Sequence, residues 1–276
     1  MTALTLRLRP EVDEAIDLSG LTPNQLLEAK PETLARIKLN GCAGRVRLAD
    51  AFECAQGDAS ETAEVCIEGH SGLLNGVAAG LEHGSFCLRG HFGDALARGM
   101  RGGHVELRGR CGDFAATGMR GGHLLIRGEA GDHLGGALPE TGAGMAGGTV
   151  VINGSAGHQL GNRMRRGLII VNGDVGEYLG ARMLAGTVMV TGQVGAHAGY
   201  NLRRGSLWLN AEGLEIPQNF ADCGVTESVY SALFTAHLKR LSRKAAALLS
   251  HADTIRLYRG DLCNGGLGEL LVFATS

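Results

Sequence analysis

The stretch from Gly173 to Gly192 reads GDVGEYLGARMLAGTVMVTG, and its pattern decides the fold because it recurs along the chain. The stretch before it, from Gly154 to Gly173, reads GSAGHQLGNRMRRGLIIVNG. Each copy carries G-x-x-G-x-x-x-G, then a methionine, a glycine and a short run of aliphatic residues. A fixed period with one strand in each copy is typical of a solenoid, whose repeats pack only on their neighbours.

The period is nineteen residues, and a few insertions interrupt it. The marker glycines stand at Gly90, Gly109 and Gly128, then at Gly154, Gly173 and Gly192. The longer step between Gly128 and Gly154 contains the insertion LPETGAG, and the coils before Gly90 are also lengthened. We therefore predict an all-β fold, a right-handed parallel β-helix of seven to eight coils. We assign residues 1–40 to an N-terminal cap, 41–211 to the β-helix, and 212–276 to a C-terminal helix and tail.

The phase of each strand fixes its faces, because side chains alternate along a strand. Positions such as Val188 and Val190 point inward together in every coil. The methionine position forms an internal ladder of Met100, Met119, Met145, Met164, Met183 and Leu202. Sharp turns between the strands explain the abundance of glycine, 45 of 276 residues, because glycine tolerates positive φ and close backbone approach.

The ends depart from the repeat. TLRLRP alternates as a strand, and Ser19 or Thr22 is the N-cap candidate of a short helix that follows it. At the other end, residues 226–251 have helical periodicity, with Leu233, Phe234 and Leu238 on one face. TIRLYRG and the tail GGLGELLVF read as strands.

Composition excludes several classes of function. The formal net charge is −2, which offers no basic excess for nucleic acid or an anionic membrane. No apolar run reaches the roughly 18 residues of a membrane helix, and the N-terminus has no signal-peptide core. The seven cysteines form no CxxC, which favours reduced thiols and a cytoplasmic location.

The outward position of successive strands is apolar where a solvated face should be polar. It is occupied by Glu106 and then by Leu125, Val151, Ile170, Met189 and Trp208. We call the last five the outward stripe. A contiguous apolar surface needs a cover. Either the 226–251 helix or another protein of the same assembly meets the outward stripe, or each covers a part of it.

A row of arginines shares another repeat position. Its members are Arg101, Arg120, Arg165 and Arg203, with Arg166 and Arg204 beside them. Such a row is a solvated set of charges that pair with acidic turns, or it is a track for an anion or an acidic partner surface, because the guanidinium fork suits carboxylates.

The sequence contains no convincing catalytic constellation. Walker A, HExxH and GxSxG are absent, and the ten histidines are scattered. His104 and His123 form a stacked pair or, less simply, a metal pair. Asp94, Asp113 and Asp132 form a ladder at a turn, where carboxylates cap backbone amides or meet arginines. We expect no metal site and no active site on this chain.

The GxxGxxxG copies resemble the C-terminal domain of the large subunit of glutamate synthase. Together with the lead-in LTPNQLLEAKPETLARIKLNG (residues 21–41), they resemble still more closely the C-type subunit of formylmethanofuran dehydrogenase and of the related bacterial formyltransferase/hydrolase complex. The resemblance covers nearly the whole chain. The repeat itself is specific to this superfamily and not to one member.

The resemblance implies a scaffold beside three other proteins, which are an amidohydrolase-like A-type subunit, a B-type subunit and a formyltransferase D-type subunit. It also implies a role in the one-carbon metabolism of methylotrophs, in which formaldehyde is oxidised. Formyl groups pass there from tetrahydromethanopterin through a methanofuran- or methylofuran-type carrier to formate. It implies zinc in a partner of this chain. Such carriers have polyglutamate tails, which gives the arginine row a ligand.

Three alternatives stay open. One is the C-type subunit of an archaeal-type molybdenum or tungsten formylmethanofuran dehydrogenase. Only four of the 26 basic residues are lysines, a bias that favours the bacterial branch. The second is a glutamate-synthase-like amidotransferase module. The third, a carbohydrate-binding β-helix, finds little support in one tryptophan and four tyrosines.

Overall fold

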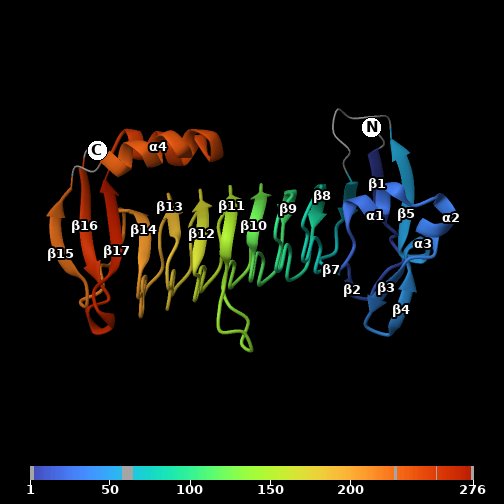
Figure 1. Ribbon diagram of the computed structural model, residues 1–276, viewed down its shortest axis with the longest axis horizontal. Helices are drawn as coiled ribbons and strands as arrows, with labels where there is room; N and C mark the ends of the chain where they lie inside the picture. The colour runs from blue at the N-terminus through green and yellow to red at the C-terminus, as the bar shows by residue number, and fades with distance from the viewer. Residues whose placement is uncertain (1–2, 58–64, 227–228, 253, 275–276) are drawn as a thin grey trace.

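The computed structural model describes residues 3–57, 65–226, 229–252 and 254–274. The fold is built mostly from strands, which form a large mixed sheet along an elongated body (Figure 1). The order of its thirteen strands is β15-β16-β17-β14-β13-β12-β11-β10-β9-β8-β6-β1-β5, and a smaller sheet has the order β4-β3-β2-β7.

The strands and helices have the following bounds. The strands are β1 (Ala3–Leu8), β2 (Ile16–Asp17), β3 (Lys38–Gly41), β4 (Gly44–Arg47), β5 (Phe52–Gly57), β6 (Val65–Gly69), β7 (Leu74–Asn75), β8 (Ser85–His91), β9 (His104–Arg110), β10 (Arg120–Ile126), β11 (Ala146–Ile152), β12 (Arg166–Val171), β13 (Thr187–Val190), β14 (Gly205–Asn210), β15 (Ala221–Val225), β16 (Thr254–Gly260) and β17 (Gly268–Ala274). The helices are α1 (Pro23–Glu28), α2 (Pro31–Ala35), α3 (Leu48–Ala51), α4 (Val229–Leu241), α5 (Arg243–Ser250) and the 3₁₀ turn η1 (Leu262–Asn264).

Successive repeats stack in register on one another. From β8 to β14 each strand pairs in parallel with the next, so that Ile170 lies beside Met189 and Met189 beside Trp208. A second parallel ladder joins Ala156 to Val175 and Val175 to Val194. At Gly173 an added Cβ would lie 2.6 Å from the carbonyl carbon of Gly154. The tight stacking of the repeats therefore demands glycine there.

The GxxGxxxG segment forms a third ladder with an unusual backbone. Tyr178, Gly180 and Arg182 all have positive φ, of 60°, 62° and 55°. Their amides bond alternately to the next coil and to the preceding one: Tyr178 N donates to Ala196 O (2.9 Å) and Gly180 N to Leu160 O (2.8 Å). The glycine pattern suggested that left-handed backbone would be confined to glycine. Tyr178 and Arg182 adopt it as well. We infer that these inter-coil bonds hold the non-glycine residues in it.

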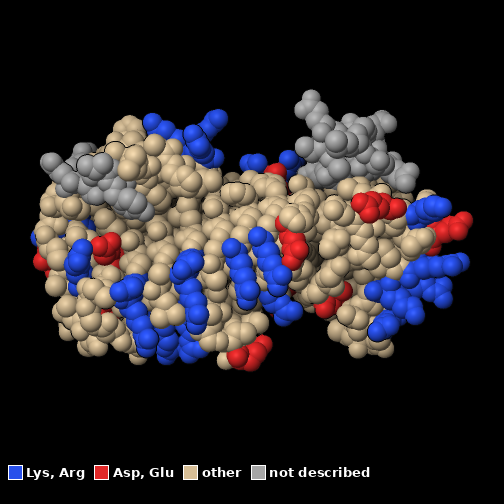
Figure 2. All heavy atoms as spheres, viewed as in Figure 1, with Lys and Arg blue, Asp and Glu red and all other residues tan. Residues whose placement is uncertain are grey.

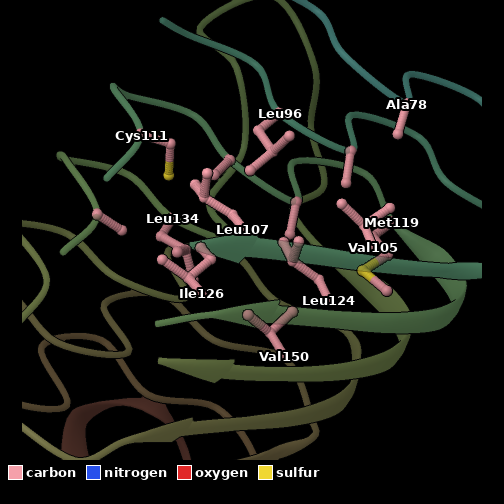
Figure 3. Close-up of a cluster of buried hydrophobic side chains, with 14 of the residues drawn as sticks. Ala78, Leu96, Val105, Leu107, Cys111, Met119, Leu124, Ile126, Leu134 and Val150 are labelled. Carbon is pink, nitrogen blue, oxygen red and sulfur yellow. The ribbon is translucent and has the colours of Figure 1, made fainter. Parts of the chain in front are cut away.

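The core runs inside the stacked repeats. The methionine ladder is buried, with Met119 and Met164 fully inaccessible, and so are the inward strand residues. Figure 3 shows Val105, Leu124 and Val150 from successive strands pointing into the same interior as Leu96 and Leu134 from the opposite wall.

Both ends of the chain join the large sheet. β1 lies between β6, with which it is parallel, and β5, with which it is antiparallel. Thr22 caps α1 by accepting from Gln25 N (3.3 Å). At the other end β17 pairs in parallel with β14, and β16 and β15 follow in antiparallel order. The carboxylate of the buried Asp261 accepts from Asn201 N (3.2 Å), where another coil would supply a carbonyl.

The C-terminal helical segment is broken into α4 and α5 at Ser242, whereas its periodicity predicted one helix over 226–251. Ser242 is extended (φ −146°, ψ 110°), and its Oγ accepts from Ala245 N (3.2 Å) as the N-cap of α5. The same Oγ bonds to Asn172 Oδ1 (2.7 Å). The break is thus stabilised by a coil seventy residues away. Residues 227–228 of the predicted helix lie outside the described residues.

No helix within the described ranges is long and apolar enough to cross a membrane.

Candidate anion-binding site

The arginine row arises from the methionine ladder. Because each methionine points inward, the residue after it points outward, and its amide bonds to the preceding coil. Arg120 N donates to Met100 O (2.7 Å), Arg165 N to Met145 O (2.8 Å) and Arg203 N to Met183 O (2.9 Å). Ala146 and Leu184 hold the same position in the intervening coils. The row is therefore interrupted at two rungs.

Two hollows lie along this row, on either side of the insertion that follows β10. We call the one nearer the N-terminus the first hollow and the other the second hollow. Their volumes are about 700 Å³ and about 470 Å³, and Gly142 and Arg165 line both. The insertion projects from the body between β10 and β11 (Figure 1). On the same face, columns of basic side chains stand on both sides of the loop (Figure 2).

The hollows collect more arginines than the sequence row predicted. Arg98 lines the first hollow with Arg101, Arg120 and Arg165. Arg163 and Arg182 line the second hollow with Arg165 and Arg203. The sequence signal for Arg163 and Arg182 was available, because they stand one period apart at the residue before the methionine.

Arg166 and Arg204, which the sequence placed beside the row, line neither hollow. Both are exposed at the entry to their strands. The structure therefore brings Arg101, Arg120, Arg165 and Arg203 to the hollows and leaves these two outside.

Elsewhere on the surface some arginines are neutralised by neighbouring carboxylates. The hydrogen bond from Arg7 lowers the pKa of Glu68. Burial raises the pKa of Glu106, but hydrogen bonds from Arg108 and Arg127, each 3.0 Å long, outweigh it and leave that pKa lowered. If the arginine row were paired in the same way, it would be a solvated set of charges neutralised by acidic residues, which is the first of the two interpretations given above.

In the hollows this pairing is largely missing. Arg101 pairs with Glu82 (2.9 Å), which holds the row's position one coil earlier. The other six form no ion pair within the described part of the chain; they are Arg98, Arg120, Arg163, Arg165, Arg182 and Arg203. Glu140 is an acidic residue at the first hollow, and no carboxylate of the described residues lines the second. Guanidinium groups arranged in this way attract carboxylates and accept them in forked hydrogen bonds.

The outward stripe lies beneath α4 and α5 over most of its length. Val151, Ile170, Met189 and Trp208 are buried in one cluster with Phe234 and Leu238 of α4 and Ala245 and Leu249 of α5. The rings of Trp208 and Phe234 are 4.9 Å apart. Leu125 lies at the margin and is only partly buried. Leu233 points away and is 66% exposed, although its periodicity placed it on the same face as Phe234.

The acidic ladder has a structural role. Asp113 N donates to Asp94 Oδ1 (2.8 Å) and Asp132 N to Asp113 Oδ1 (2.8 Å), so the expectation that these carboxylates cap turn amides is confirmed. His104 and His123 lie on adjacent strands as predicted, but their rings are tilted by 46° with centroids 6.4 Å apart and are therefore not stacked. Among the described residues, no three side chains of the types that bind metals come together.

Comparison with known proteins gives a strong likeness to a solved structure. No protein-family model matches the sequence, and no curated protein matches it. Among solved structures, a chain of the formyltransferase/hydrolase complex (FhcABCD) from Methylorubrum extorquens, crystallised in complex with methylofuran, is 39% identical. The match covers 97% of this chain and 98% of that chain, with a TM-score of 0.88. The chain therefore belongs to the family of proteins that build formyltransferase/hydrolase complexes.

Proposed function

We propose that this chain is the C-type subunit of a formyltransferase/hydrolase complex and works there as a non-catalytic scaffold. The near-complete likeness to a chain of such a complex carries the proposal, because both chains are covered almost end to end. The complex would move formyl groups from tetrahydromethanopterin through a methanofuran-type carrier to formate in the cytoplasm. The partners would be the A-, B- and D-type subunits, and one of them would hold zinc. The similar complex from Methylorubrum extorquens was crystallised with methylofuran, which is a carrier of this type.

The architecture that we propose is a right-handed parallel β-helix of about nineteen residues per coil, over residues 41–211. A cap at 1–40 precedes it, and a helical segment and tail at 212–276 follow it. Three hydrogen-bonded ladders with one period support this interpretation. Crossovers between parallel strands of one sheet are right-handed in about 98% of cases. A scaffold benefits from such a body, because each repeat is held by two neighbours and the surface is long.

The arginines of the hollows support a role in binding the carrier's tail. A polyglutamate chain presents a carboxylate on every residue, and the second hollow offers Arg163, Arg165, Arg182 and Arg203 with no competing carboxylate from the described ranges. Coils repeat at about 4.8 Å, so guanidinium groups recur along the rod as carboxylates recur along the tail. The role that we assign to this chain is to hold the tail electrostatically.

Co-purification tests the assignment of the chain. The tagged chain, purified from its own host, should bring an amidohydrolase-like protein and a formyltransferase, identified by mass. Partners rich in iron–sulfur clusters with molybdenum or tungsten would place it instead in a formylmethanofuran dehydrogenase. A chain that elutes alone as a stable monomer would contradict the scaffold role.

Charge reversal tests the hollows. In the assembled complex, Arg120→Glu with Arg165→Glu should weaken binding of labelled oligo-L-glutamate at least roughly tenfold, because two attractive contacts become repulsive. The matched control is Arg166→Glu with Arg204→Glu, which makes the same charge change outside both hollows. Equal weakening by both pairs would mean that only net charge matters. No weakening by either pair would remove the hollows as the site.

A further inference from the structure

The N-terminal end of the large sheet stops at an open edge. Among the strands that the structure describes, β5 is the last, and it pairs on one side only, with β1. Glu53, Cys54 and Ala55 are exposed. None of these three forms a backbone hydrogen bond beyond β1 within the described part of the chain. An edge strand of this kind is a template for pairing with another chain.

A hollow of about 460 Å³ opens beside this edge. Leu4 of β1, Phe52 and Cys54 of β5, and residues of α1, α2 and the start of α3 line it. Its floor is continuous with the main core, because Leu4, Leu26, Leu34 and Phe52 belong to the central hydrophobic cluster. Its rim includes the half-buried Leu27 and Ala35.

Most of the side chains that line the hollow are apolar, and the charged one has partners. Arg9 is the charged side chain among the residues that line it. Its Nε donates to Ala49 O (3.2 Å), and its Nη1 lies 3.6 Å from Glu53. The guanidinium is therefore already compensated, which leaves space suited to an uncharged side chain.

The geometry of β5 links the edge to the hollow. Side chains of a strand alternate between two faces, so Phe52 and Cys54 face the hollow while Glu53 faces away. A strand added beside β5 would likewise direct every second side chain toward the hollow. Recognition by strand addition uses these two elements, main-chain bonds for affinity and a pocket for alternate side chains.

We propose that β5 and this hollow dock an extended segment of a partner protein in the complex, which adds one strand to the sheet and places an apolar side chain in the hollow. The inference rests on the proposed function, because it requires a chain that works within a complex of different proteins. The unpaired backbone favours an extended polypeptide over a small ligand, and the compensated Arg9 favours an apolar anchor over an acidic one.

A variant and a matched control test the docking in the co-expressed complex. Leu27→Lys places a charge at the rim of the hollow, whereas Gln25→Lys places the same charge on an exposed, non-lining position of the same helix. We expect Leu27→Lys to reduce recovery of one partner protein at least roughly tenfold, because a charge at the rim opposes the burial of the partner's apolar anchor. Gln25→Lys should leave recovery unchanged, and the thermal midpoints of both free variants show whether they fold.

The native Cys54 provides a second measurement that needs no substitution. Its maleimide labelling should be at least roughly tenfold slower in the assembled complex than in the free chain. Normal assembly of Leu27→Lys, or equal labelling of Cys54 in both states, would overturn this inference alone. If the free chain forms a dimer through this edge and Leu27→Lys dissociates that dimer, the occupant of the hollow is a second copy of this chain. That result would also overturn the proposal of a partner segment. A chain that recruits no partner protein would overturn the proposed function as well.

Discussion

Phe234→Ala should release the C-terminal helices from the outward stripe, whereas Leu233→Ala should do almost nothing. Phe234 is 6% exposed and its ring lies 4.9 Å from that of Trp208, which is fully buried. Leu233, the preceding residue, is 66% exposed. The two residues differ in burial while sharing the same helix, so they form a matched pair.

The magnitudes follow from this burial. Truncation of a buried phenylalanine to alanine costs about 3–5 kcal/mol, from lost transfer free energy and from the cavity that remains. A surface substitution without special contacts stays within about 0.5 kcal/mol. The hydrogen bonds of Ser242 and Lys244 to Asn172 are not touched by either change, so any loss of helix docking is due to the ring itself.

Fluorescence measures the effect directly, because Trp208 is the only tryptophan in the sequence and lies under α4. In urea titrations, the Phe234→Ala transition should shift to lower urea and acrylamide should quench Trp208 more strongly. Leu233→Ala should follow the parent protein in both measurements. Equal effects of the two substitutions, or an unshifted transition for Phe234→Ala, would refute this account of the helix cover.

Three further predictions concern the body of the protein. Asp113→Ala should lower the free energy of unfolding by about 1 kcal/mol, because Asp132 N loses its acceptor. Asp113→Asn keeps an oxygen at that place and should lose less stability. Thermal midpoints of the two variants measure the difference. The pKa of Glu106 is lowered in the folded state. Its ionised form therefore stabilises the fold at neutral pH, and this stabilisation is lost as the pH falls through the pKa of the folded state. Glu106→Gln should therefore show a smaller decrease in melting temperature on acidification, and an unchanged pH profile would contradict the role of its bonds to Arg108 and Arg127. Burial raises the pKa of Cys111 to about 12, so iodoacetamide at neutral pH should label the exposed Cys223 and Cys263 of the native chain and spare Cys111, as peptide mass mapping would show.

Several features could be predicted from sequence because they depend only on the period. When each coil stacks in register on the last, the nineteen-residue spacing places equal positions side by side, as in the methionine ladder and the strand pairs from β8 to β14. The Asp94–Asp113–Asp132 ladder follows for the same reason. The full-length resemblance also predicted the family, which the solved complex confirms.

Other features depend on contacts between segments far apart, and the period says nothing of these. Serine is a preferred N-cap residue, but the bond from the Ser242 hydroxyl to Asn172, on a coil seventy residues away, exists only in the tertiary structure. The C-terminal segment adds β17 to β14 and so extends the sheet beyond the last repeat.

The candidate site shows the same division. The sequence by itself determined that Arg101, Arg120, Arg165 and Arg203 share one row, because the row is a property of the repeat. Only the tertiary structure decided that the insertion separates two hollows, that Arg98, Arg163 and Arg182 join them, and that Arg166 and Arg204 do not. The physical reason is that a repeat specifies which residues are neighbours along the rod, whereas a hollow depends on how an irregular loop packs across several coils.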